Sequence, residues 1–95
     1  MMYLKDLGFE EDVIKSMEDN LPELALKKLK EKKEVVINNV NYLIELGVTN
    51  YVDAFVKFYN MFLMDYETFD DIFSKYDRED LIAKLEKNVA IMEYL

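Results

Sequence analysis

Apolar residues are densest between Tyr51 and Tyr76, a stretch that holds nine of the thirteen aromatic residues. In its first half, apolar residues fall on nearly every side of a helix rather than along one stripe. A helix with this pattern is enclosed by its neighbours. We therefore predict that this stretch forms the centre of the core, with a break in the helical structure near Met64 and Asp65.

The segment before this stretch predicts three helices. Residues 3–7 give a short apolar face that ends at Gly8, and glycine readily adopts the left-handed conformation that ends a helix. Between Gly8 and Pro22, apolar residues are spaced i, i+1, i+4 and i+8, which predicts a second helix. Proline suits the first turn of a helix, and no breaker follows it before Gly47. The pattern therefore predicts one long third helix over residues 22–46.

The chain also contains an internal repeat. A shift of 39 residues superposes Leu7 on Leu46 and Gly8 on Gly47, and it also superposes apolar positions of the helices that follow. A third copy lies 29 residues further on, where Tyr76 takes the place of Gly47. Repetition of this kind indicates a stack of similar units, each too small to bury its apolar face alone.

Two glycines, one proline and abundant Leu, Lys, Glu and Met residues predict an all-α fold. It comprises about six helices, arranged as a small helical repeat or bundle of three stacked helix-turn-helix units. A chain of 95 residues is long enough for one independent core. We expect a single domain over residues 1–95, with units at about 1–26, 27–64 and 65–95.

The repeat resembles that of the mitochondrial transcription termination factor (mTERF) family. The resemblance depends on the turn Leu46-Gly47-Val48, a short helix, and a segment of the kind Pro-x-Leu-Leu before the next helix, and it covers residues 4–92. It implies helical units that stack into a curved solenoid and bind nucleic acid through a basic concave face. The chain departs from the family in two ways: Pro22 is its only proline, and its net charge is acidic.

Composition narrows the possible functions. The net charge of −8 argues against general binding to a phosphate backbone and favours a basic protein partner. Cysteine and histidine are absent, which excludes disulfides and the usual zinc ligands, so we expect no metal site and no cofactor. Ser16, Thr68 and Ser74 have no histidine to activate them, so we expect no catalytic residue and no enzyme.

Location and origin are also suggested by the sequence. No signal-like start and no long apolar run occur, so we expect a cytoplasmic protein that does not enter a membrane. The frequent Lys, Asn, Ile and Tyr residues suggest an AT-rich genome of a bacterium or a phage.

Five lysines form a candidate basic patch: Lys27, Lys28, Lys30, Lys32 and Lys33. They could contact an acidic partner or nucleic acid. Alternatively they form a solvated face, with Lys27–Glu31 and Lys30–Glu34 pairs worth about 0.2–0.5 kcal/mol each. We favour the solvated face because the aromatic residues that would stack on bases are not interleaved with the lysines.

The aromatic residues suggest a candidate partner surface at Tyr59, Phe62 and Tyr66. Tyrosine, phenylalanine and methionine are enriched at interfaces, and a buried tyrosine hydroxyl needs a partner. The alternative is that these side chains belong wholly to the core. The acids Asp65 and Asp77 are expected to cap the helices that follow them.

The leading hypothesis is therefore a non-enzymatic helical protein that binds another protein through the groove between units or through exposed aromatic residues near Tyr59–Tyr66. Self-association, with a dimer as one form, is included in this hypothesis. Two alternatives remain open. One is a nucleic-acid-associated repeat protein like the resembled family, with the five lysines as the contact. The other is an acidic inhibitor that imitates nucleic acid and occupies a nucleic-acid-binding protein.

Overall fold

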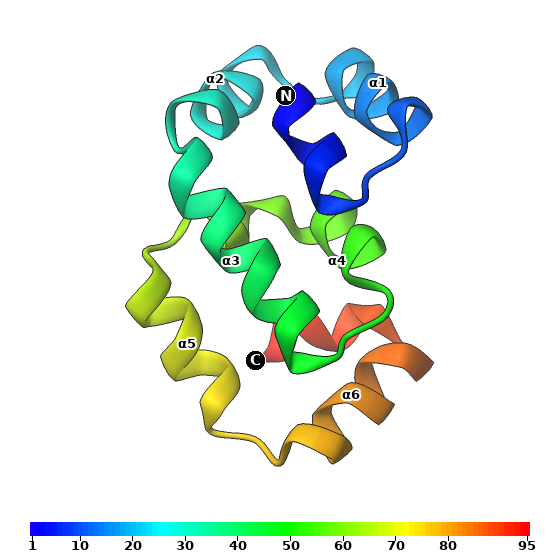
Figure 1. The fold of residues 1–95 in the computed structure, drawn as a ribbon, viewed down its shortest axis with the longest axis vertical. Helices are drawn as coiled ribbons and strands as arrows, with labels where there is room; N and C mark the ends of the chain where they lie inside the picture. The colour runs from blue at the N-terminus through cyan, green and yellow to red at the C-terminus, as the bar shows by residue number, and fades with distance from the viewer.

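The computed structural model describes residues 1–95 and contains six α-helices and three 3-10 helices, with no strand (Figure 1). The predicted all-α class is confirmed. In chain order the elements are η1 (Met2–Leu7), α1 (Glu11–Asn20), α2 (Glu23–Glu31), α3 (Lys33–Leu46), α4 (Tyr51–Phe58), η2 (Tyr59–Leu63), α5 (Tyr66–Ser74), α6 (Arg78–Lys87) and η3 (Val89–Tyr94).

The elements are stacked along the longest dimension of the molecule, which is 35 Å (Figure 1). Helices η1, α1 and α2 occupy one end, α3 and α4 the middle, and α5 and α6 the other end. Helix α3 is central, because η1, α2, α4, η2 and α5 all pack against it. Helix η3 returns from the far end to pack against α4 and α6.

Several predicted helix ends are confirmed, but the predicted cap at Asp65 is wrong, because its side chain accepts no hydrogen bond from the backbone of α5. Gly8 and Gly47 have φ angles of 91° and 104°, which is the left-handed conformation expected of glycine at a helix end. The carboxylate of Asp77 accepts a hydrogen bond from the backbone N–H of Asp80 at 3.1 Å and so caps α6. The predicted break lies where expected, since Met64 follows the last residue of η2 and Asp65 precedes α5.

The second and third units share one order of elements. Each consists of an α-helix, a turn, a second α-helix and a 3-10 helix: α3, α4 and η2 in one, and α5, α6 and η3 in the other. The first unit differs, because it begins with the 3-10 helix η1 and continues into α2. The predicted boundary between residues 26 and 27 falls inside α2, so no helix end separates the first two units there.

The long third helix is the main error of the sequence prediction. The helix is interrupted at Lys32, whose φ and ψ angles of −100° and 31° separate α2 from α3. Near this break, the hydroxyl of Tyr3 donates a hydrogen bond to the carbonyl of Leu29 at 2.7 Å. In an unbroken α-helix that carbonyl would pair with the N–H of Lys33. A side chain from η1 thus satisfies a backbone group next to the interruption.

The Tyr3 hydrogen bond predicts a stability that falls at alkaline pH. Burial raises the pKa of Tyr3 to about 12, above the value of about 10 expected in the unfolded chain. The neutral phenol therefore stabilises the folded state fully below about pH 10, and this contribution is lost as pH rises through about 12. Tyr3→Phe should lower the free energy of unfolding by about 1 kcal/mol at neutral pH, because the Leu29 carbonyl loses its donor.

Urea unfolding of both proteins at about pH 8 and pH 11 measures this effect. The difference between wild type and Tyr3→Phe should shrink at the higher pH, where the phenol of the wild type becomes costly to keep neutral. Tyr94→Phe is the control, since Tyr94 is 80% exposed. A Tyr3→Phe difference that stays constant across this pH range would contradict the assignment.

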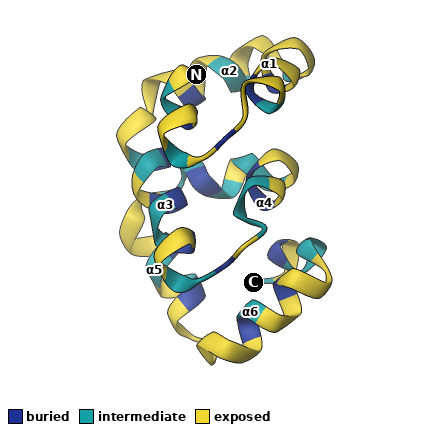
Figure 2. Ribbon diagram, turned by 45° about the vertical axis from the view of Figure 1, so that its right-hand side comes forward, coloured by how far each residue is buried: buried dark blue, intermediate teal, exposed yellow.

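The core contains a continuous series of aromatic rings. Ring centroids lie 5.3 Å apart for Phe9 and Phe55, 5.0 Å for Phe55 and Phe62, 5.3 Å for Phe62 and Phe69, and 4.6 Å for Phe69 and Phe73. All five side chains are almost completely buried. Four of them come from the predicted core stretch, and Phe9 extends the series into the first unit. Figure 2 shows buried positions on the inward sides of the helices.

One polar side chain lies within this core. Asn39 of α3 is fully buried, and its amide nitrogen donates hydrogen bonds to the carbonyls of Phe62 at 2.9 Å and Met64 at 2.8 Å. These carbonyls belong to the end of η2 and the residue after it, where the chain leaves helical geometry before α5. Asn39 therefore supplies the donors that this break requires.

Candidate functional site

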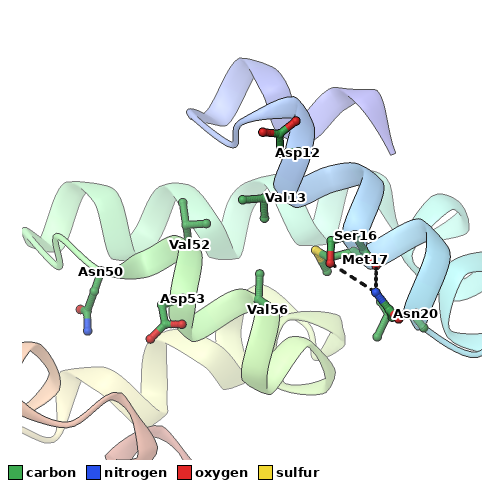
Figure 3. Close-up of a pocket in the computed structure, with 10 residues that line it drawn as sticks. Asp12, Val13, Ser16, Met17, Asn20, Asn50, Val52, Asp53 and Val56 are labelled. Carbon is green, nitrogen blue, oxygen red and sulfur yellow. Dashed lines mark hydrogen bonds between the residues drawn. The ribbon is translucent and has the colours of Figure 1, made fainter.

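The largest hollow on the surface lies between α1 and α4, with a volume of about 760 Å³ (Figure 3). We call it the α1–α4 groove. Its lining residues are Asp12, Val13, Ser16, Met17, Asn20, Leu21, Asn50, Val52, Asp53 and Val56. A volume of this size is within the range of pockets that hold small ligands or several side chains of a partner.

The floor of the α1–α4 groove is apolar and comes from two matching helix stripes. Val13 and Met17 are four residues apart on α1, and Val52 and Val56 are four residues apart on α4. Figure 3 shows the side chains of Val13, Val52 and Val56 directed into the space between the helices. The shift of 39 residues that defines the repeat superposes these two pairs. The groove is therefore the seam between equivalent faces of the first and second units.

The seam is held at one end by a hydrogen bond between the units. The hydroxyl of Tyr51, the first residue of α4, donates to the carbonyl of Leu7 at 2.6 Å. Leu7 ends η1, and a Cβ atom on the adjacent Gly8 would collide with the Tyr51 hydroxyl. Since α1 packs against η1, this contact fixes α4 relative to the helix on the other side of the groove.

Polar groups at the ends of the groove are engaged in helix-end contacts. The amide of Asn20 donates to the carbonyl of Ser16 at 2.7 Å and to its hydroxyl at 3.3 Å (Figure 3). At the opposite end, the amide nitrogen of Asn50 donates to the carbonyl of Leu85 at 2.9 Å. The Asn50 Oδ1 atom is buried and has no hydrogen-bond partner. The Asn20 amide thus acts at the end of α1.

The charges around the groove are acidic. Asp12 and Asp53 are its only charged lining residues, and Figure 3 places them on opposite margins of the two helices. The Asp53 carboxylate lies 3.3 Å from the ammonium of Lys57, in a pair whose side chains are about half exposed. Asp12 takes part in no salt bridge. The groove therefore combines an apolar floor with at least one free carboxylate at its margin.

The predicted partner surface of Tyr59, Phe62 and Tyr66 needs correction. Phe62 is 0% exposed, because η2 turns its ring inward between Phe55 and Phe69. It cannot contact a partner in the folded protein.

The two tyrosines of that predicted surface border different hollows. Tyr59 is half-buried beside the C-terminal residues Met92 and Leu95. Tyr66 is 43% exposed and packs edge-on against Tyr42, with ring centroids 5.9 Å apart. The structure therefore does not bring the three predicted residues into one exposed surface.

The five lysines of the basic patch are all exposed, at the end of α2 and the start of α3. Lys27 lies 3.9 Å from Glu31, as the spacing predicted. The predicted Lys30–Glu34 pair does not form, because the break at Lys32 separates the two residues onto different helices. Lys33 lies over the ring of Tyr3, 5.7 Å from its centroid.

Lys27 and Lys30 border a second hollow of about 620 Å³ along α2, together with Glu23, Leu24 and Leu26. Leu24 is 64% exposed. This part of the patch therefore combines cations with an exposed apolar side chain.

The hydroxyl groups of Thr68 and Ser74 take part in local contacts. Thr68 donates to the carboxylate of Asp65, and Ser74 donates to the carbonyl of Asp71 at 3.4 Å. No group of three or more acidic side chains is arranged to hold a metal ion. None of the helices has the length and apolar character needed to span a bilayer.

Comparison with protein-family models, with curated proteins and with solved structures finds no match to this chain.

The sequence predicted a binding groove between units but did not identify the residues that line the α1–α4 groove. The signal was present in the repeat, which superposes Val13 on Val52 and Met17 on Val56. Two superposed apolar stripes on neighbouring units predict that the stripes face one seam. They do not predict whether the seam closes or stays open, because that depends on the distance at which the helices pack.

Proposed function

We propose that this protein is a non-enzymatic binding protein whose α1–α4 groove receives an apolar segment of a basic protein partner. The observation that carries the proposal is the groove itself, with its apolar floor and its acidic margins. Val56, at 36% exposed, is the part of this floor most open to water. A partner that covers it would remove apolar surface from water, which is the main driving force of association.

A helical segment suits this groove. Two helices form its walls, and an amphipathic helix lies in such a groove with side chains at positions i, i+3 or i+4, and i+7. The floor residues also repeat every four positions along α1 and along α4. Apolar side chains with the same spacing on a partner would therefore meet both stripes.

Charge makes a basic partner the better fit. Asp12 and Asp53 lie at the margins of the groove, and the protein carries a net charge of −8. Complementary charge speeds association and disfavours partners of like charge. Nucleic acid would meet the same acidic margins with its phosphates, so we place nucleic-acid binding second and the imitation of nucleic acid by the acidic surface third.

A titration with a designed peptide tests the proposal. The probe is a 14-residue amphipathic peptide with leucines on one face and lysines elsewhere, and its counterpart carries glutamates in place of the lysines. Addition of the lysine peptide should shift the backbone amide signals of α1 and α4 in two-dimensional NMR spectra. The glutamate peptide should shift them much less, because it faces Asp12 and Asp53.

The matched variants are Val56→Glu and Ile44→Glu. Their side chains are 36% and 37% exposed, but only Val56 lines the groove. Val56→Glu should weaken binding of the lysine peptide at least tenfold, because a charged group replaces part of the apolar floor, whereas Ile44→Glu should bind as the wild type does. Equal affinity in the two variants, or shifts that lie outside α1 and α4, would overturn the proposal.

A further inference from the structure

We infer that the partner received by the α1–α4 groove is helix α2 of a second copy of this chain. The inference rests on the proposed function, since it names an occupant for the same groove. It predicts self-association in which the face of α2 that carries Leu24 on one copy docks between α1 and α4 of another.

The exposed face of α2 has the chemistry that the groove requires. Leu24 is 64% exposed, and Lys27 and Lys28 lie three and four residues later, on the same side of the helix. One apolar side chain is thus followed by two cations, at the spacing of an amphipathic anchor. The groove offers the converse arrangement, in which apolar Val52 and Val56 lie beside acidic side chains.

The distribution of charge along the chain supports this pairing. Residues 27–33 contain five lysines and one glutamate, whereas the whole chain has a net charge of −8. The molecule therefore has one strongly basic segment and is acidic elsewhere. Of the surfaces described here, the α2 face is the one that combines clustered cations with a highly exposed leucine.

Within a single copy, the exposed face of α2 does not dock in the α1–α4 groove. Helix α2 is anchored on η1, because Leu29 is fully buried and its carbonyl accepts the hydrogen bond from Tyr3. From there the chain continues through Lys32 into the central helix α3. Leu24 therefore stays exposed on the free monomer, and a second copy must provide the groove that covers it.

The contact joins two different surfaces, so one copy can give α2 while its own groove receives α2 of another. Leu21 lines the groove and α2 begins two residues later at Glu23, so the two surfaces adjoin along the chain. The weight-average mass of the wild type, measured by light scattering or sedimentation equilibrium, should rise with protein concentration.

Charge-reversal variants of the two surfaces test the inference. The first variant is Asp12→Lys with Asp53→Lys, which reverses the groove, and the second is Lys27→Glu with Lys28→Glu, which reverses α2. Each variant alone should lose self-association, because like charges now meet at the contact. A mixture of the two should recover it, since the reversed α2 of one variant complements the reversed groove of the other.

The control is Glu67→Lys with Asp71→Lys on α5, which changes the net charge by the same amount as the groove variant at two exposed positions. It should associate as the wild type does, and circular dichroism should show native helix content in every variant. The inference is overturned if the wild type stays monomeric up to about millimolar concentration. It is also overturned if the mixture fails to recover self-association, or if the control loses as much self-association as the groove variant does.

These outcomes are separate from those of the peptide titration. A lysine peptide that binds α1 and α4 of a chain that remains monomeric would leave the proposed function standing and remove only the second copy as its partner. Failure of both experiments would remove the groove as a binding site.

Discussion

Replacing Phe62 by alanine is expected to lower the free energy of unfolding by about 3–5 kcal/mol. The Phe62 side chain is 0% exposed and lies in the middle of the aromatic series, with its ring centroid 5.0 Å from Phe55 and 5.3 Å from Phe69. Its removal leaves a cavity and also ends two aromatic contacts, which add to the loss of buried area. Since small domains are stable by only about 5–15 kcal/mol, the variant should be close to unfolded.

Urea unfolding followed by circular dichroism measures this loss, with Tyr66→Ala as the matched control. Tyr66 lies four residues later and is also aromatic, but it is 43% exposed. Its truncation should cost about 1 kcal/mol or less, because much of its surface is already in water. If Phe62→Ala cost no more than Tyr66→Ala, the placement of Phe62 between the second and third units would be wrong.

The same result limits how binding by this protein can be tested. A charged residue at position 62 would remove binding by unfolding the chain, whatever surface the partner uses. Val56→Glu avoids this problem, because Val56 is 36% exposed and contributes little to the core. We therefore propose the seam between α1 and α4 as the partner surface, in place of Tyr59, Phe62 and Tyr66.

Much of the fold could be predicted from the sequence, because local signals and the repeat agree. Gly8 and Gly47 end helices at positions where only a residue without a side chain adopts a positive φ angle easily. Asp77 caps the helix that follows it through a contact only three residues long. Helix ends of this kind depend on residues that are close together in the sequence, so the sequence pattern is enough to predict them.

The long predicted helix shows where local signals fail. Leu29 and Val36 are seven residues apart, so they would lie on one side of a continuous helix, and the pattern gives no reason for a break. The break coincides with a contact to Tyr3, which lies 26 residues from Leu29 in the sequence. The spacing of apolar residues within one segment cannot predict a contact with a residue far away in the sequence.

The residues of the candidate site could not be identified from the sequence for a related reason. In the stretch after Tyr51, apolar residues surround the helix on all sides, so their spacing cannot distinguish the buried Phe62 from the half-exposed Val56. The 3-10 geometry of η2 and the contact with Asn39 decide which side chains point inward. Asn39 itself gave no signal, since a single polar residue in an amphipathic helix is ordinarily solvated.

Asn39 is therefore the position where a nearly isosteric change should have an effect that the sequence alone would not suggest. In Asn39→Asp, a carboxylate replaces the amide nitrogen that donates to the carbonyls of Phe62 and Met64 at 2.9 and 2.8 Å. At neutral pH a buried negative charge would face two carbonyl oxygens with no donor between them. Breaking a buried polar arrangement in this way costs about 3–5 kcal/mol, so the variant should be largely unfolded.

The loss in Asn39→Asp should depend on pH in a defined direction. Burial and the two carbonyl oxygens favour the protonated acid, so the pKa of this aspartate in the folded variant should lie above the unfolded value of about 3.9. A raised folded-state pKa means that stability is retained below the unfolded pKa and lost as pH rises. The protonated acid can also donate one of the two lost hydrogen bonds, which restores part of the contact at acid pH.

Urea unfolding of Asn39→Asp and Asn38→Asp at about pH 7 and pH 4 separates this effect from the general response of an acidic protein to pH. Asn38 is adjacent on α3 but exposed, so its replacement adds the same charge without burying it. The difference in stability between the two variants should be large at pH 7 and smaller at pH 4. If the two variants were equally stable at pH 7 and also at pH 4, the break between η2 and α5 would not depend on the Asn39 amide. A difference that does not change with pH would show that the loss comes from the missing donors alone, with the introduced carboxylate in contact with water.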